Sequence, residues 1–199
     1  MGTHENAFAE PPVLDHRPMS NVSWSLDIDG VAVEDVFAFM ASLENLAAWH
    51  PLVRGAVRWQ SHVSPLVPDT RPVGVGTTYR LLFCGALADL MRCRVHAYEP
   101  PYYVEWHCQG ALRTLRLAVG VSTPSEGTVR VQVRWAWVWR GWRRVPGVAR
   151  AAHRAAYAVA DAARDGLERC LEHFKRGTVH VPPRQVAVTD AEEAAAPGG

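Results

Sequence analysis

Four side chains in this 199-residue chain could carry acid–base or electrostatic chemistry. Arg113 bears a permanent charge and fixed hydrogen-bond donors, which suit a carboxylate, a phosphate or an enolate oxygen. Tyr79 and Tyr157 are candidate proton donors toward a substrate carbonyl, and His153 is a candidate base, if they border a cavity. The alternatives are an arginine at a rim, with its charged group in water, and partly exposed side chains without a catalytic role.

Signatures of other chemistries are absent from the sequence. Its nine histidines show no HxxxH or HExxH spacing, so we predict no metal site. The glycines at 74 and 76 are not followed by a helical pattern, which argues against a nucleotide loop. No GxSxG motif and no cysteine beside a histidine in a suitable turn supports a covalent nucleophile. The sequence therefore predicts a protein without a cofactor.

A strand and a long helix near the C-terminus would position these side chains. Residues 129–139 alternate Val and Trp with mostly polar or small residues, which indicates a strand with one buried face. A helical pattern then runs from Pro146 to about residue 176, or about 45 Å of helix. Its apolar stripe contains Val148, Ala152, Ala155, Val159, Ala162, Gly166, Cys170 and Phe174. Such small side chains predict a close approach of helix and sheet or an internal cavity, and the tryptophans of the strand favour a cavity.

Six further strands are predicted from alternating apolar residues, at 21–29, 53–59, 77–83, 90–99, 102–108 and 112–121. Two short helices follow the first strand, the second capped by Ser42 and stopped by Pro51. If the later turns are hairpins, the predicted cross-strand pairs are His96–Glu105, Glu105–Arg116, Trp106–Leu115, Leu115–Trp135, Arg116–Arg134 and Arg113–Trp137. One face is then polar (His96, Glu105, Arg116, Arg134) and the other apolar (Val95, Trp106, Leu115, Val119, Val133, Trp135).

Four local patterns carry a resemblance to a known superfamily. They are Asn45-Leu-Ala-Ala-Trp49-His-Pro51, Gly74-Val-Gly76-Thr77, the hairpin Val95…Tyr98-Glu-Pro-Pro-Tyr102, and Gly127-Thr-Val-Arg-Val131. With the order of elements, they make residues 21–176 resemble the START-like, or SRPBCC, helix-grip superfamily of the polyketide cyclase/dehydratase type. The resemblance implies an α+β helix-grip fold: a seven-stranded curved antiparallel sheet with two short helices and one long C-terminal helix enclosing a cavity.

A small hydrophobic, polyketide-like or aromatic ligand is what this resemblance implies. The favoured role is a cofactor-free polyketide cyclase or dehydratase; the alternatives are a lipid, quinone or hormone-like carrier, and a regulatory or co-chaperone-like interaction domain. The expected ligand contacts are Trp49, Trp106, Leu115, Trp135, Trp137 and Val159. At the corner formed by Trp49, His50 and Pro51, the alternative to ligand contact is a structural plug with Trp49 packed and His50 exposed.

Composition and charge bear on the partners, the cellular location and the state of the cysteines. A formal net charge of +1 argues against nucleic acid as the main partner. No apolar run approaches a membrane span, and the N-terminus lacks the pattern of a secretory signal, so we expect a cytoplasmic protein. The four cysteines are expected to be small buried hydrophobic residues in a reducing compartment rather than members of a disulfide or metal site.

The ends of the chain and one basic cluster lie outside these patterns. Residues 1–20 are expected to form a flexible leader, and residues 177–199 a disordered tail. Arg140, Arg143 and Arg144 precede the long helix. They are interpreted either as a docking patch for an acidic partner, such as an acyl carrier protein, or for anionic lipid, or as a solvated helix start.

Overall fold

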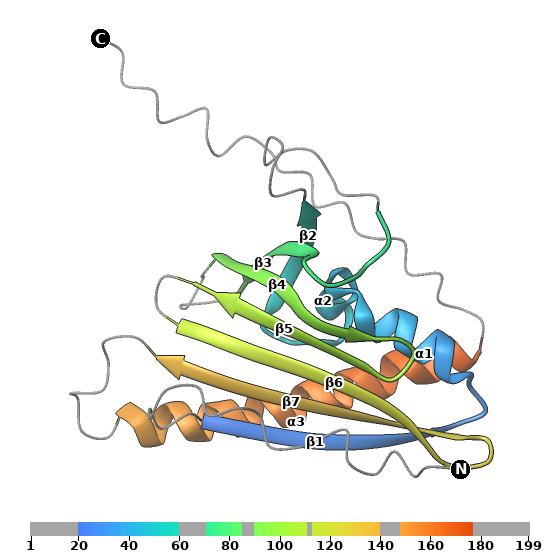
Figure 1. Cartoon of the computed structure of the whole chain (residues 1–199). Coiled ribbons are helices and arrows are strands. Elements are labelled where there is room, and N and C mark those ends of the chain that lie inside the picture. Colours follow the sequence, from blue (N-terminus) through green and yellow to red (C-terminus); the bar gives the residue numbers. More distant parts are fainter. Residues whose placement is uncertain (1–19, 60–70, 85–89, 111–112, 140–147, 177–199) are drawn as a thin grey trace.

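A computed structural model describes residues 20–59, 71–84, 90–110, 113–139 and 148–176 of the chain. Seven strands, three α-helices and one 3₁₀ turn follow one another within these ranges (Figure 1). In chain order they are β1 (Ser20–Asp29), α1 (Val33–Ala41), η1 (Leu43–Asn45), α2 (Leu46–Trp49), β2 (Val53–Trp59), β3 (Thr78–Phe83), β4 (Leu90–Glu99), β5 (Tyr103–Gln109), β6 (Arg113–Ser125), β7 (Thr128–Trp139) and α3 (Val148–Lys175). The predicted order of elements is confirmed.

All seven strands form one curved antiparallel sheet in the order β1-β7-β6-β5-β4-β3-β2. The helices lie on the same side of this sheet, and α3 runs along its β1 edge (Figure 1). Alternation places the apolar side chains of each strand on the side that the helices cover, because successive residues of a strand point to opposite faces. The α+β helix-grip architecture predicted from the sequence is therefore confirmed.

The two predicted faces of the sheet are also confirmed, although the register differs. Val95, Trp106, Leu115, Val119, Val133 and Trp135 are all buried on the inner face. Trp106 pairs with Leu117, and Leu117 pairs with Trp135, so the β5–β6 and β6–β7 registers are each two residues from those predicted. A shift of two residues keeps every side chain on its own face.

Two local features account for the differences in the β6–β7 and β4–β5 pairings. β6 continues to Ser125, and the reversal into β7 uses the next two residues, where Gly127 adopts a φ of +78°. The centre of the hairpin therefore lies one position nearer the glycine than predicted, which changes each β6–β7 pairing by two residues. In the β4–β5 hairpin the shift between Val95 and Ala97 leaves His96 unpaired, so Glu105 lies opposite Ala97 rather than His96.

The buried face of α3 differs from the predicted stripe. Ala160, Ala163, Gly166, Leu167 and Leu171 are buried, whereas Ala155 and Ala162 of the predicted stripe are exposed. The helix is turned toward its two leucines because burying a leucine releases more free energy than burying an alanine. Gly166 belongs to both faces, and it approaches the end of α2 closely, a contact that the sequence did not predict.

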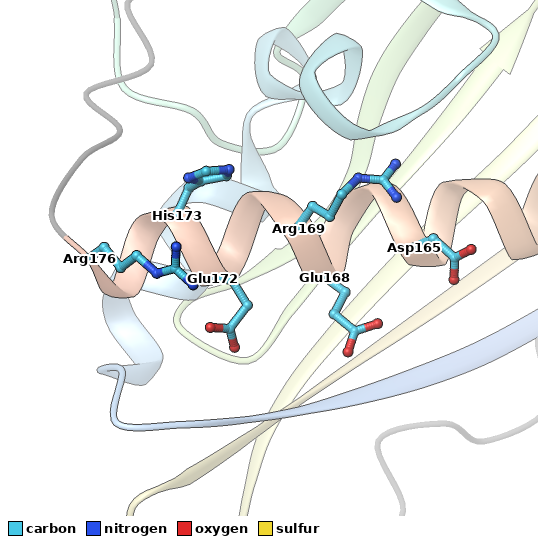
Figure 2. Close-up of a pocket in the computed structure, with 6 residues that line it drawn as sticks. All are labelled: Asp165, Glu168, Arg169, Glu172, His173 and Arg176. Atoms are coloured by element: carbon cyan, nitrogen blue, oxygen red, sulfur yellow. The ribbon is translucent and has the colours of Figure 1, made fainter.

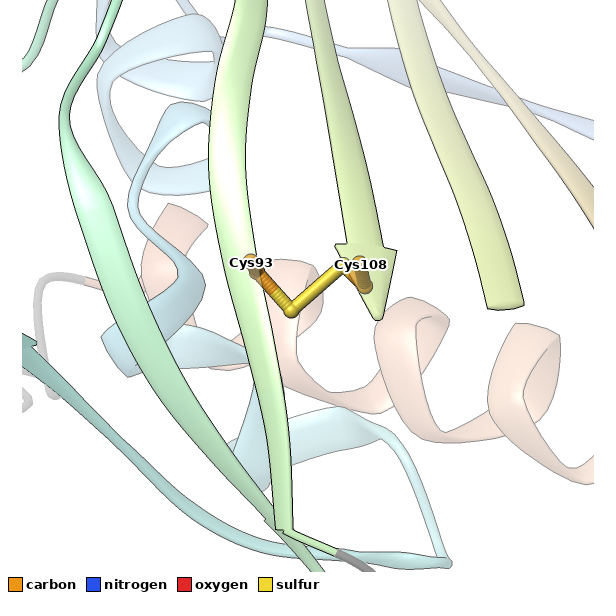
Figure 3. Close-up of a disulfide and its surroundings, with 2 residues drawn as sticks. All are labelled: Cys93 and Cys108. Carbon is orange, nitrogen blue, oxygen red and sulfur yellow. A yellow bond between two sulfur atoms is a disulfide. The ribbon is translucent and has the colours of Figure 1, made fainter. Parts of the chain in front are cut away.

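The cysteines correct another expectation. Cys93 on β4 and Cys108 on β5 are directly opposed and form a disulfide in the core (Figure 3). Among the described residues, Cys84 and Cys170 remain free. The sequence offered no CxxC spacing because the two partners are brought together by strand pairing, 15 residues apart.

Candidate functional site: an aromatic interior lined by hydrogen-bond donors

The end of α2 carries an aromatic cluster. His50 stacks on Trp135, with ring centroids 4.5 Å apart and planes inclined by 22°. Trp49 makes an edge contact with the same Trp135 ring at 6.4 Å and with Trp24 at 6.3 Å. Trp49 is packed, as the structural-plug alternative has it, but His50 is only 4% exposed, so that alternative is wrong about the histidine. The histidine is buried because Trp135 of β7 offers it a flat apolar surface.

Hydrogen bonds and a close helix contact fix this corner. The backbone N–H of Leu52 donates to His50 Nδ1 at 3.3 Å, so a neutral His50 carries its proton on Nε2. From α3, the Cys170 thiol donates to the Ala48 carbonyl at 3.3 Å, and Gly166 packs against the Trp49 carbonyl. α3 therefore holds the end of α2, and with it both rings, over the sheet.

The floor beneath the corner consists of residues opposed across neighbouring strands. One row runs from Tyr79 through Cys93 and Cys108 to Leu115. The next row runs through Val95, Trp106, Leu117 and Trp135. The buried side chains of both rows belong to the main core cluster. The floor is therefore apolar apart from a few polar atoms.

Those polar atoms are hydrogen-bond donors. Among the described residues, the indole N–H groups of Trp24, Trp106 and Trp135 are buried without a hydrogen-bond partner. The Tyr79 hydroxyl is also buried, and it makes no well-formed hydrogen bond. The hydroxyl of the nearby Ser42 donates to Glu44 instead of capping the helix. Burial is the main cause that raises the pKa of Tyr79 well above its usual range, so the phenol stays protonated. Buried donors without acceptors cost free energy unless something supplies the acceptors.

The predicted site residues are only partly brought together. Tyr79, Trp106, Leu115 and Trp135 lie buried on the floor, and Trp49 lies buried at the corner above them. Val159 is half-buried on α3. Tyr157 is 45% exposed on the N-terminal half of that helix, and its catalytic role stays a prediction.

Several predicted residues lie wholly or partly outside the described part of the structure. Arg113 pairs with Trp139, not with Trp137 as predicted, and Trp137 pairs with Leu115. The side chains of Arg113, Trp137 and His153 are outside the described part of the structure. The predicted docking arginines Arg140, Arg143 and Arg144 lie outside the described residues, as do residues 1–19 and 177–199. These assignments stay predictions.

A surface depression on α3 is not part of this site. It is lined by Asp165, Glu168, Arg169, Glu172, His173 and Arg176, all on the C-terminal half of the helix or just beyond its end (Figure 2). Charged groups of both signs, such as the Glu172–Lys175 pair at 3.0 Å, border it. An open, charged surface of this kind does not suit a hydrophobic ligand. No predicted site residue belongs to it.

Sequence reasoning missed two members of the aromatic cluster. Trp24 was visible only as one of several alternating residues of the first strand, and its contact with Trp49 depends on the packing of α2 against β1. His50 follows a helix end, a position that is usually exposed. The signal that could have identified it is the proline at 51, which stops the helix and turns the chain toward the sheet.

A curved antiparallel sheet with a long C-terminal helix along one edge and an aromatic interior defines a protein of the START-like helix-grip class. Residues 19–175 match the family described as "Polyketide cyclase / dehydrase and lipid transport", and the chain belongs to this family. No curated protein matches significantly. Among the described residues, no helix is both long enough and apolar enough to cross a membrane.

Solved structures support the fold. A START superfamily protein from Mycobacterium smegmatis is similar at a TM-score of 0.59 and 15% identity, covering 77% of this chain and 98% of the other. The Zhui aromatase/cyclase from Streptomyces sp. R1128 has a TM-score of 0.56 and 12% identity, with 82% and 98% covered. The di-domain ARO/CYC StfQ from the steffimycin biosynthetic pathway has a TM-score of 0.57 and 13% identity, with 80% and 51% covered.

Proposed function

We propose that the protein binds a polyketide-like molecule rich in carbonyl oxygens on the inner face of its sheet and cyclises or dehydrates it without a cofactor. The observation that carries this proposal is the set of buried donors: three indole N–H groups have no partner among the described residues. A saturated hydrocarbon chain would leave every one of them unsatisfied. A poly-β-ketone would supply acceptors at regular intervals along an otherwise apolar chain, so it fits this lining better.

The chemistry proposed is an intramolecular aldol condensation. An enol carbon of the bound chain attacks a carbonyl carbon of the same chain, a proton passes to the new alkoxide, and water leaves in the dehydration. Confinement of the two reacting carbons supplies much of the acceleration. A hydrogen bond from the Tyr79 hydroxyl would polarise the carbonyl under attack. Family membership supports this reaction class, and the neighbouring aromatase/cyclases share the fold.

Arg113 is assigned the stabilisation of the enolate oxygen, with His153 or Tyr157 as the group that moves the proton. Its support is the backbone position of Arg113 at the start of β6, two residues from buried Leu115. A guanidinium cannot lose its proton at neutral pH and therefore stabilises an oxyanion without becoming neutral.

Two probes of equal chain length test the proposal: a linear 1,3,5-triketone thioester of N-acetylcysteamine and a saturated fatty acid. Quenching of tryptophan fluorescence reports binding, and mass spectrometry reports loss of water from the triketone. We expect the triketone to bind at least tenfold more tightly and to be cyclised. Arg113→Ala should abolish turnover and retain binding, whereas Arg94→Ala, at an exposed position of β4, should change neither.

Equal affinity for the two probes, with no turnover, would refute the cyclase and favour the carrier. Binding of neither probe would refute both ligand-binding roles. Tyr79→Phe adds a direct test of the donor argument, because it removes one hydroxyl and almost no volume. We expect it to weaken triketone binding about tenfold and to leave fatty-acid binding unchanged, which corresponds to one hydrogen bond of about 1.4 kcal/mol.

A further inference from the structure

The outer face of the sheet, opposite the proposed ligand site, carries a compact polar cluster. It consists of His96 on β4, Tyr103, Glu105 and His107 on β5, and Arg116 on β6. Alternation along β5 separates the two faces: Trp106 points into the core between Glu105 and His107. The cluster therefore does not belong to the inner site, and no step of the proposed reaction uses it.

Two imidazoles and a carboxylate converge within this cluster. His107 Nε2 lies 2.6 Å from Glu105 Oε1, and the His96 ring stacks on the His107 ring with centroids 4.1 Å apart. The candidate donor atoms of His96, Glu105 and His107 all lie within 4.8 Å of one another. Alternation along β4 places His96 on this outer face, because its neighbour Val95 points into the core.

The Glu105 carboxylate is held in place by hydrogen bonds from two further side chains. Arg116 donates through Nε to Glu105 Oε1 at 2.5 Å and through Nη2 to Oε2 at 2.8 Å. The Tyr103 hydroxyl donates to Oε2 at 2.6 Å. Glu105 is only 3% exposed, so its orientation is fixed, whereas His96 is exposed and can rotate. Such outer partners orient a metal-binding carboxylate and are typical of metal centres.

We propose that His96, His107 and Glu105 form a binding site for a divalent transition-metal cation, of which Zn²⁺ is the probe of choice. Two imidazole nitrogens and one carboxylate oxygen are a donor set that Zn²⁺ accepts, with a fourth position left for water. On binding, the proton on His107 Nε2 moves to Nδ1, the metal takes its place, and Glu105 keeps Arg116 and Tyr103 on its remaining lone pairs. Because the Arg116 charge opposes a dication, we expect a Kd on the order of 1–10 μM.

The test uses the full-length chain, stripped with EDTA and titrated calorimetrically with Zn²⁺ at pH 7.5. His96→Ala and His107→Ala should each raise the Kd for Zn²⁺ at the proposed site at least tenfold. His173→Ala, at an exposed histidine of α3, is the matched control and should leave that site unchanged. Co²⁺ in place of Zn²⁺ should give visible d–d bands in the wild type that His96→Ala removes.

The outcomes separate clearly. His96 is exposed, so its substitution leaves the core intact, and an unchanged melting temperature of the metal-free variant would verify this. A Kd for His96→Ala within twofold of the wild-type value would overturn the proposal, because binding would then belong to other histidines. No one-to-one binding tighter than about 100 μM would overturn it as well. Neither result touches the proposed cyclase, which is measured without metal.

Discussion

Gly166→Ala offers the sharpest test of how the aromatic corner is held. A β-carbon added at Gly166 would lie 2.2 Å from the Trp49 carbonyl oxygen and 3.1 Å from its carbonyl carbon. Both are backbone atoms of α2, so no flexible side chain can move aside. Ordinary contact begins near 3.4 Å, and α3 and α2 would have to separate by about 1 Å to reach it.

The cost follows from what that separation disturbs. Ala163, Leu167 and Leu171 of α3 are at most 1% exposed, and a shift of the helix loosens all three at once. Overpacking costs about 1–3 kcal/mol, and a clash with backbone atoms lies at the upper end of that range, about 3 kcal/mol. Alanine's better helix propensity returns about 1 kcal/mol of it. We therefore expect Gly166→Ala to destabilise the protein by about 2 kcal/mol and to lower its Tm by about 4–8 °C.

Urea unfolding followed by circular dichroism measures this free energy, and near-ultraviolet dichroism reports the packing of Trp49 and Trp135. Ala162→Gly is the control, because it changes helix propensity at an exposed position of α3 and should cost about 1 kcal/mol. Without the close contact, Gly166→Ala would stabilise the protein by about that amount. The sign of the change therefore decides: equal or greater stability of Gly166→Ala would refute the contact and the support it gives to His50.

Three further predictions concern the sheet. Glu105→Gln leaves the Arg116 charge without its partner in a largely buried position and should cost about 3 kcal/mol in urea unfolding; a loss below 1 kcal/mol would contradict this. Because the folded-state pKa of Glu105 is lowered to about 2 from 4.5, its contribution is complete above pH 4.5 and declines as the pH falls toward 2. The urea midpoint should therefore fall across that interval in the wild type, and less steeply in Glu105→Gln; parallel curves would rule this out. Alkylation of the unfolded, unreduced chain should modify Cys84 and Cys170 only, and reduction of Cys93–Cys108 should cost up to about 3 kcal/mol; four modified cysteines without reductant would disprove the disulfide.

The sheet could be predicted from the sequence because alternation is a local property. The alternation within a strand indicates which of its residues face the core, even where the pairing between strands is predicted wrongly. The turn between β6 and β7 illustrates the limit. Pro124 is a strong turn signal, but Gly127 accepts the positive φ that the tight turn requires, and the reversal occurs there. The faces were therefore predicted correctly and the partners across the strands were not.

The site was harder to predict because its members meet only through tertiary packing. The stack of His50 on Trp135 joins the end of α2 to the seventh strand, and nothing in either segment specifies the other. The orientation of α3 depends on which of two overlapping apolar stripes buries more surface, and the leucines decide it.

The outer cluster and the inner floor are mechanically linked through β5. Glu105 and His107 are fixed from outside by Arg116 and by each other, and Trp106 between them is fixed by the same backbone. The Arg116 side chain ties β5 to β6 at the level where Trp106 pairs with Leu117. A strand anchored in this way keeps the Trp106 indole N–H in place without a partner for it, which is the preorganisation that the proposed binding of a carbonyl oxygen requires. Loosening the outer cluster should therefore weaken the discrimination between ketone and hydrocarbon on the opposite face, and triketone binding by Arg116→Leu measures that coupling.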